Sequence, residues 1–271
     1  MFAEIWISRI FVVFIFAGEI FVSNAMSSGY LVLGGSGMHD SSDNIAHFLS
    51  LPTETANGHT KVYTNTSSRW LHYEDFLEQP MSIDVDYTRK QLYVYNSYTA
   101  TLQNVQFDPE INGRNLAFKI LHSGLSRSHV KIAIDWISNN IYWTDPTFRW
   151  IAIQSLQNHS HYMILIHDSG ERPTGIALNP IHKYLFWSDV GSLPKIERSS
   201  LTGSDRKTIV SQGIVYPIAL DVDIALSKLY WVDSERDTVE RSNLDGTERT
   251  TIRRLISSTF FDIAVFALQR N

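Results

Sequence analysis

Apolar and polar residues along the chain follow a pattern of short runs rather than long helical stripes. Runs of about five β-branched or aromatic residues are separated by Gly, Pro, Asn and Asp, which predicts β-strands joined by tight turns. Between 130 and 254 the pattern becomes regular, because an apolar run that ends in Asp or Asn is followed seven residues later by an aromatic pair. The pairs begin at Tyr142, Phe186 and Tyr230, which are 44 residues apart. The chain therefore contains a tandem repeat.

A repeat of this length predicts one blade of a β-propeller. Four strands are expected per blade. In the first copy the three strands nearest the axis are expected at 131–134, 141–144 and 149–155. The outer strands of the second and third copies are expected at 205–210 and 248–252. Gly203 and Gly246 stand at turns where a tight hairpin requires a positive φ. The pattern alone predicts a propeller but does not fix the number of its blades.

The aromatic pair belongs to a four-residue motif that occurs three times. Its copies are Tyr142, Trp143, Thr144 and Asp145; Phe186, Trp187, Ser188 and Asp189; and Tyr230, Trp231, Val232 and Asp233. Similar flanks follow the second and third copies, at 195–203 and 240–246. Motif and flanks resemble the YWTD repeat of the low-density lipoprotein receptor and receptor-related proteins. The resemblance covers roughly residues 30–271 and implies an all-β, six-bladed YWTD-type β-propeller.

The same resemblance implies a ring that is incomplete at the carboxyl end. The repeat spacing places an inner strand at 261–266 and the next aromatic pair beyond Asn271. At the other end, three strands of a partial blade are expected at 30–33, 45–51 and 60–63. We therefore expect about four full repeats plus partial units. Unpaired strand edges in the incomplete blades favour self-association.

Residues 1–25 have the features of a secretory signal peptide. Arg9 precedes an apolar run at 10–18, and the small residue Ala25 ends the segment. The run is shorter than the roughly 20 residues that a membrane span requires, and a retained amino-terminal anchor is the alternative. We expect a truncated propeller domain at 26–271 without a membrane span, either secreted or forming the luminal part of a truncated membrane receptor.

Composition fits one globular domain, with 44% hydrophobic and 12% aromatic residues. A net charge of −5 argues against a nucleic-acid partner. The chain has no cysteine, so packing rather than disulfides must stabilise a secreted form. Asn65 and Asn158 each begin an N-x-Ser triplet and are candidate N-glycosylation sites in a secretory context.

Carboxylates and histidines are the candidate chemical groups. Asp84, Asp86, Asp135, Asp221 and Asp223 occur at repeat positions, which favours structural roles over catalysis or calcium binding. A group of histidines is interpreted as part of a solvated loop rather than a metal site or acid sensor, and its members are His159, His161, His167 and His182. The sequence has no Gly-x-Ser-x-Gly elbow, no His-Glu-x-x-His motif and no cysteine nucleophile. We expect no enzymatic activity, metal or cofactor.

The resemblance implies an extracellular protein-binding module of a receptor or co-receptor. Relatives use this propeller to contact secreted ligands such as Wnt antagonists, agrin or laminin, or to release lipoprotein in acidic endosomes. In several of them the binding face is made by residues just after the motif and just before the inner strand. The corresponding positions in this chain are Pro146, Arg172, Val190, Tyr216 and Ser234. Secreted or cell-surface proteins are the expected partners.

Two alternatives stay open. Six-bladed propellers include lactonases and related hydrolases with a metal in the central channel, and the recurring carboxylates could imitate such a site. The chain could also be a fragment of a longer receptor without an independent function. Metal analysis with a lactone or ester screen tests the first alternative, and the transcript sequence beyond Asn271 tests the second.

Overall fold

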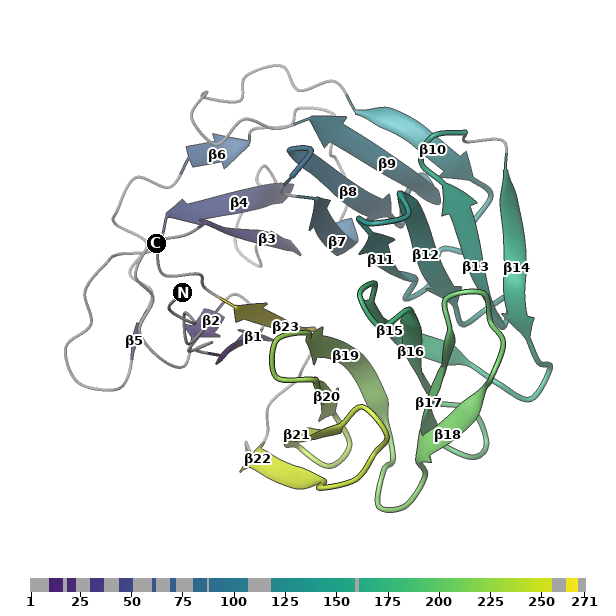
Figure 1. Cartoon of the computed structure of the whole chain (residues 1–271). Coiled ribbons are helices and arrows are strands. Elements are labelled where there is room, and N and C mark those ends of the chain that lie inside the picture. Colours follow the sequence, from purple (N-terminus) through teal and green to yellow (C-terminus); the bar gives the residue numbers. More distant parts are fainter. Residues whose placement is uncertain are drawn as a thin grey trace, which may run out of the picture.

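The computed structural model is all-β, with six antiparallel sheets arranged as blades around a central axis (Figure 1). It describes the backbone of residues 10–16, 19–22, 30–36, 44–50, 60–61, 69–71, 80–86, 88–106, 118–158, 161–254 and 262–267. Side chains are described for 82–86, 88–106, 118–158, 161–254 and 262–265. The arrangement confirms the predicted propeller.

Four blades are built from strands that follow one another along the chain. Blade 2 contains β7 (Pro80–Asp86), β8 (Gln91–Asn96), β9 (Thr101–Gln106) and β10 (Lys119–Ser123). Blade 3 contains β11 (Lys131–Asp135), β12 (Asn140–Asp145), β13 (Trp150–Ser155) and β14 (Tyr162–His167). Blade 4 contains β15 (Pro173–Asn179), β16 (Tyr184–Asp189), β17 (Lys195–Ser200) and β18 (Lys207–Val210). Blade 5 contains β19 (Pro217–Asp223), β20 (Lys228–Asp233), β21 (Thr238–Asn243) and β22 (Thr250–Arg254). The strand bounds expected for blades 3 to 5 lie within two residues of the observed ones, and β7 begins three residues before the expected start at 83.

The two remaining blades differ from the expectation. Blade 1 contains β3 (Tyr30–Ser36), β4 (Asn44–Ser50) and β6 (Arg69–Leu71). Its third strand was expected at 60–63, but β5 (Thr60–Lys61) pairs instead with β2 (Glu19–Val22) in blade 6. The short segment Arg69–Leu71 takes the place beside β4 because the register there allows it to pair with residues 46–48.

Blade 6 joins the two ends of the chain. The terminal strand β23 (Ile263–Ala267) pairs with β1 (Ile10–Phe16), which pairs in turn with β2. The expectation of an unpaired terminal strand is therefore corrected, because the apolar run of β1 supplies its backbone partners. Residues expected to form a signal peptide provide β1 and β2 here, and cleavage after Ala25 stays a prediction.

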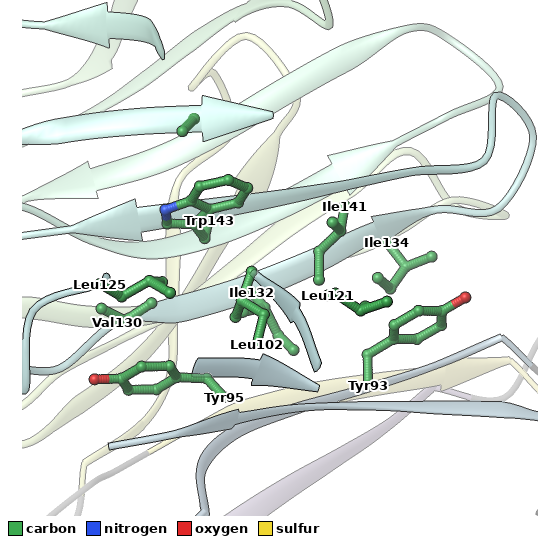
Figure 2. Close-up of a cluster of buried hydrophobic side chains, with 11 residues drawn as sticks. Tyr93, Tyr95, Leu102, Leu121, Leu125, Val130, Ile132, Ile134, Ile141 and Trp143 are labelled. Atoms are coloured by element: carbon green, nitrogen blue, oxygen red, sulfur yellow. The ribbon is translucent and has the colours of Figure 1, made fainter. Parts of the chain in front are cut away.

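The core lies between the blades. Successive side chains of a strand point to opposite faces of its sheet, so Trp143 packs against blade 2 while Tyr142 packs against blade 4. Figure 2 shows Trp143 above the blade 2 residues Tyr95 and Leu102. Trp187 and Trp231 occupy equivalent positions in the next two interfaces. Equal spacing of the motif in the sequence thus becomes equal packing between neighbouring blades.

Neighbouring inner strands approach in two different ways. The carboxylate of Asp84 accepts a hydrogen bond from the backbone N–H of Ile134 at 2.7 Å, and that of Asp221 accepts one from Val265 at 2.7 Å. Between blades 4 and 5 the strands instead pack closely, because a Cβ on Gly175 would lie 2.9 Å from the Cα of Ala219. A glycine is therefore required at residue 175 by close approach.

Candidate functional site

The end of the propeller where the second strand of each blade finishes carries the expected binding positions. We call this end the upper face. It is formed by the turns at 97–100, 146–149, 190–194 and 234–237 and by the segments that lead into β11, β15 and β19. Antiparallel pairing brings each of these turns beside such a segment, so residues about 17 positions apart meet there.

The last residue of each motif copy holds these loops in place. Asp233 is fully buried and accepts hydrogen bonds from the backbone N–H groups of Val215 at 2.7 Å and Tyr216 at 3.0 Å. Asp189 accepts from Arg172 and Gly191, both at 2.7 Å. Each carboxylate therefore joins the segment before an inner strand to the turn that follows the motif. Buried carboxylates bonded in this way rigidify the loops that they connect.

Asp145 forms the same kind of clamp in blade 3. Its oxygens accept from the backbone N–H of Ser126 at 2.9 Å and from the hydroxyl of Ser126 at 2.6 Å. They also accept from the N–H groups of Thr147 and Phe148 at 3.0 Å. In blade 2 the corresponding residue is Asn96, which accepts from the N–H groups of Tyr98 and Thr99 in its own turn. The motif aspartates thus build the upper face, as their recurrence in the sequence indicated.

Two pairs of the expected binding residues are in contact. The N–H of Val190 donates to the carbonyl of Arg172 at 3.0 Å, and the N–H of Ser234 donates to the carbonyl of Tyr216 at 3.1 Å. Pro146 has no N–H and cannot form the equivalent bond. The two segments that the sequence argument selected are therefore neighbours in blades 4 and 5, and their role in binding stays a prediction.

Exposure separates the five positions into two groups. Arg172 is exposed, and Tyr216 and Ser234 are half-buried, whereas Pro146 and Val190 are buried. In blades 3 and 4 the residue directly after the motif turns inward, so it offers little surface to a partner, whereas Ser234 in blade 5 stays partly exposed.

The exposed apolar side chains of the upper face lie at the tips of its loops. They are Tyr98, Phe148, Leu193 and Val215. Sequence reasoning missed them because it took the positions nearest the motif instead of the turn tips. For Tyr98, Phe148 and Leu193 the usable signal was a large apolar residue two to four positions after the motif, where a solvated turn would normally be polar, whereas Val215 lies two residues before β19.

Arginines accompany these apolar residues. The guanidinium of Arg127 lies 5.8 Å from the ring centroid of Tyr98, and that of Arg149 donates to the carbonyl of Ser169. Arg172 adds an exposed cation between blades 3 and 4. A surface with aromatic and arginine side chains on restrained loops suits contact with another protein.

The opposite end of each blade is capped by the polar residues that recur at the end of the inner strand. Asp135 accepts from the N–H of Ser138 at 3.0 Å, Asp223 from that of Leu226 at 2.8 Å, and Asp86 from that of Arg89 at 3.0 Å. Asn179 accepts from His182 at 3.0 Å. These bonds confirm the structural interpretation of the recurring carboxylates at this position.

Asp84 and Asp221 differ from the turn-capping residues. They lie on inner strands near the axis, and burial raises the pKa of Asp84 to about 6 and that of Asp221 to about 7. The negative charge of Asp262 adds to both shifts. Lys131 pairs with Asp262 at 2.7 Å. The sequence placed Asp84 and Asp221 among recurring positions, but blades 3 and 4 have Ala133 and Ala177 there.

The histidine group does not form one site. His161 and His167 stand at opposite ends of β14, and both are exposed. A strand of this length separates them by roughly 20 Å, so they cannot share a metal. His182 belongs to the lower turn of blade 4, and His159 lies outside the described residues. Within the part that is described, the solvated interpretation of these side chains is confirmed.

The candidate glycosylation sites differ in what is described. Asn158 is exposed after β13, where a glycan has room. Asn65 lies outside the described residues. Among the residues with a described placement, no helix has the length and apolar character needed to cross a bilayer.

Comparisons with known proteins agree with the fold and with the motif. A family model described as "Low-density lipoprotein receptor repeat class B" matches residues 183–224, which include the second motif copy. The vitellogenin receptor of Solenopsis invicta is 32% identical over 135 residues, covering 50% of this chain and 8% of that protein. The human low-density lipoprotein receptor-related protein 5-like protein is 32% identical over 121 residues, covering 45% of this chain and 48% of that protein. The chain thus spans less than half the length of these relatives.

Solved structures show the same fold over nearly the whole chain. A chain of the nidogen/laminin complex has a TM-score of 0.59 and 17% identity, with coverage of 95% of this chain and 98% of that one. A putative TolB from Agrobacterium tumefaciens has a TM-score of 0.62 and 10% identity, with coverage of 97% and 100%. At these identities the likeness concerns the fold alone.

Proposed function

We propose that this propeller, whose residues 183–224 match the class B repeat of the low-density lipoprotein receptor, is an extracellular module that binds protein ligands through the upper face. The observation that supports this most directly is the set of loops held by Asp145, Asp189 and Asp233. A surface whose loops are already ordered loses less conformational entropy when a partner binds.

The chemistry of the upper face supports a protein ligand. Tyr98, Phe148 and Leu193 present apolar area at the loop tips, and Arg172 adds a guanidinium. Aromatic and arginine side chains contribute much of the binding energy in protein interfaces. Wnt-pathway and lipoprotein-type ligands are the finer proposal. The vitellogenin receptor and the nidogen/laminin complex are relatives or neighbours whose names point to protein partners.

Binding of purified chain to vitellogenin and to laminin tests the proposal, with a secreted Wnt antagonist as a third probe. The variant Leu193→Asp/Tyr98→Asp places charge on two loop tips and should weaken binding by on the order of 100-fold. Ile181→Asp, on an exposed lower turn, is the matched control and should leave the affinity unchanged. Equal affinity of parent and upper-face variant for a bound probe would contradict the proposed face.

We further propose that the module is not an enzyme. The motif carboxylates are buried and saturated with backbone N–H donors, which is a structural arrangement. Calcium-dependent turnover of lactone or ester substrates by the purified chain would contradict this proposal and favour the hydrolase alternative.

A further inference from the structure

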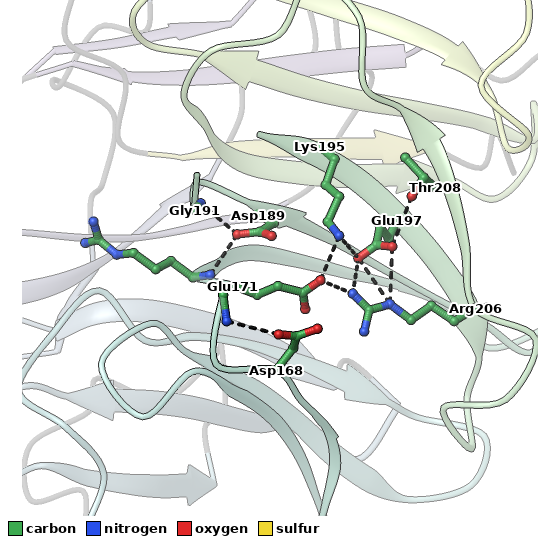
Figure 3. Close-up of polar contacts among 10 residues, drawn as sticks. Asp168, Glu171, Asp189, Gly191, Lys195, Glu197, Arg206 and Thr208 are labelled. Carbon is green, nitrogen blue, oxygen red and sulfur yellow. Dashed lines mark hydrogen bonds and ion pairs between the residues drawn. The ribbon is translucent and has the colours of Figure 1, made fainter. Parts of the chain in front are cut away.

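Three successive grooves lie between blades 2 and 3, blades 3 and 4, and blades 4 and 5. Corresponding strand positions carry different side chains in these grooves. In the groove between blades 3 and 4, Arg206 lies over Trp187, with its guanidinium carbon 5.3 Å from the ring centroid. Figure 3 shows Glu171, Lys195 and Glu197 around this arginine. The Lys195–Glu171 contact measures 2.7 Å and the Arg206–Glu197 contact 2.5 Å. This groove is filled by an ion-paired network.

The groove between blades 4 and 5 is filled in the same manner. Arg249 lies over Trp231 with its guanidinium carbon 5.3 Å from the ring centroid, and its Nε pairs with Glu240 at 2.5 Å. Its two terminal nitrogens donate to the carbonyls of Gln212 and Gly213. An arginine therefore covers the motif tryptophan in two consecutive grooves.

In the described part of the groove between blades 2 and 3 no arginine covers the tryptophan, and the ring of His122 lies 5.0 Å from that of Trp143 instead. Strand register places Ala152 where the other blades have Glu197 and Glu240, because each of the three pairs with the same position of its outer strand. Two residues before that outer-strand position, Tyr162 stands where the other blades have Arg206 and Arg249. The missing guanidinium and carboxylate leave a cavity of about 350 Å³ on the Trp143 side of the groove.

The lining of this cavity matches the contacts of the two built-in arginines. Trp143, Trp150 and Tyr162 supply aromatic surface. Gly124 and Leu125 also line it, and by register they correspond to Gln212 and Gly213, whose carbonyls receive Arg249. The cavity thus offers a π surface beside backbone positions that accept a guanidinium elsewhere in the ring.

His122 adds a hydrogen-bond acceptor to the lining. Its Nδ1 lies 2.8 Å from Oε1 of Gln154, while Nε2 of Gln154 donates to the carbonyl of Leu121 at 2.8 Å. The amide oxygen can only accept, so Nδ1 carries the proton and Nε2 of His122 is an acceptor. Burial lowers the pKa of His122, which keeps the ring neutral near pH 7.

Exposed apolar side chains of β14 line this cavity. Tyr162 and Ile164 are 56% and 42% exposed. The outer strands β18 and β22 of the filled grooves read KTIV and TTIRR, so they present mainly polar and charged residues instead. Exposed apolar side chains in the wall of a cavity suit contact with a protein partner.

We propose that the groove between blades 2 and 3 is a second protein-binding site, which receives an arginine side chain of the partner while apolar residues beside that arginine cover Tyr162 and Ile164. Arginine fits better than lysine because a guanidinium is planar, stacks on aromatic rings and is more weakly hydrated than an ammonium group. With Ala152 in place of a glutamate, the cation is held by π surface and carbonyl oxygens. The site lies on the side wall, so it is separate from the upper face of the proposed function.

The test uses the full chain and a capped pentapeptide with a leucine on each side of a central arginine. Nuclear magnetic resonance should show shifts of the Trp143 and Trp150 indole N–H signals, with the Trp231 signal unchanged. The citrulline peptide has the same shape without the charge, and it should bind on the order of tenfold more weakly, as expected for one lost cation–π contact. The lysine peptide should fall between the two.

Variants of the chain can fill the cavity with an arginine of its own, which should exclude the arginine of the peptide. Ala152→Glu/Tyr162→Arg copies the built-in pair of blades 4 and 5 and should abolish the peptide-induced shifts. Tyr162→Arg alone gives a second readout if the double variant folds poorly. The reciprocal variant Glu240→Ala/Arg249→Tyr removes the arginine cover from the groove between blades 4 and 5. It should make the Trp231 signal respond to the peptide.

Three results would overturn the inference. They are equal binding of the arginine and citrulline peptides, unchanged binding to the folded Tyr162→Arg variant, and no shift at about 1 mM peptide, the weak limit for a specific single contact. Upper-face ligands serve as the independent control, because their binding should be unaffected by these side-wall variants. Failure of the side-wall site is therefore distinguishable from failure of the upper face.

Discussion

The groove between blades 2 and 3 and the two grooves that follow it share a fold but not a surface. All three contain a buried motif or motif-like strand and the same strand register. Arg206 and Arg249 close the later grooves over their tryptophans, whereas Trp143 faces a cavity. The difference arises at three positions of the groove, which are Ala152, Tyr162 and, on the facing outer strand, His122. A repeat can thus keep its packing core and alter the chemistry of one groove with few substitutions.

The same contrast exists at the axis. Inner strands of blades 2 and 5 reach their neighbours through Asp84 and Asp221, while Ala133 and Ala177 stand at those positions in blades 3 and 4. Both kinds of contact connect neighbouring inner strands. Among the described residues, those made by Asp84 and Asp221 also bury titratable groups. The blades are therefore similar in backbone and unequal in electrostatics.

The largest expected effect concerns the tryptophans that the grooves have in common. Trp187→Ala should lower the free energy of unfolding by about 3–5 kcal/mol, because the side chain is fully buried between blades. Trp143→Ala should cost about 1 kcal/mol less, since one side of its ring already borders a cavity and fewer contacts are lost. Urea unfolding of both variants measures the difference. Equal costs would show that the cavity does not weaken the packing of Trp143.

The acidic contacts at the axis predict a pH dependence. Asp84 and Asp221 have folded-state pKa values of about 6 and about 7, both raised from 3.8. The folded chain therefore binds more protons than the unfolded chain between pH 4 and 7, so stability falls as pH rises through this window. Each pKa unit corresponds to about 1.4 kcal/mol, which gives a loss on the order of a few kcal/mol.

Urea midpoints at several pH values between 4.5 and 7.5 test this dependence. Asp221→Asn should flatten the dependence of the urea midpoint on pH. Asparagine also loses one acceptor for the N–H of Val222 or Val265, which lowers stability at every pH. The slope of the dependence is therefore the readout. Asp245→Asn, on an exposed turn of blade 5, is the control and should keep the slope. A parent profile without a decline over this range would contradict the shifted pKa values.

Breaking the ion-paired cover of one filled groove should have a smaller effect. Glu197→Gln removes a charge that is 5% exposed and pairs with Arg206 and Lys195. We expect a loss of about 2 kcal/mol, below the usual cost of breaking a buried pair because both cations are partly solvated and Glu171 stays nearby. Thermal unfolding measures it. Glu248→Gln, in an exposed pair with Lys228, should have almost no effect, and a similar loss in both variants would contradict the role of burial.

Much of the fold was predictable because the spacing of the repeat is fixed by the lengths of its strands and turns. Asp135 and Tyr142, like Asp223 and Tyr230, are seven residues apart since a capped turn and a strand of fixed length separate them. The spacing gave four blades and their strand bounds. It could not show that β1 pairs with β23, because that contact joins opposite ends of the chain and carries no repeat signal.

The upper face was predictable only in part. The sequence identified the segments around Arg172 and Tyr216, which the motif aspartates hold at the upper face. It did not show that Val190 is buried, because the direction of one side chain depends on the turn that follows. The side-wall cavity escaped notice since it results from Ala152 and Tyr162, which are unremarkable until register aligns them with Glu197 and Arg206.

The smallest expected effect comes from transferring the cover to the open groove. Ala152→Glu/Tyr162→Arg should be more stable than Ala152→Gln/Tyr162→Arg by about 0.5–1 kcal/mol, the range for a partly exposed ion pair with a cation–π contact. The glutamine variant matches the first in size and differs only in the charge that faces the arginine. Urea unfolding in low salt measures the gap, and about 1 M salt should shrink it because exposed charges are screened. If the two variants unfold together in low salt, the groove between blades 2 and 3 does not place its residues as the filled grooves do, and the equivalence of the three grooves fails.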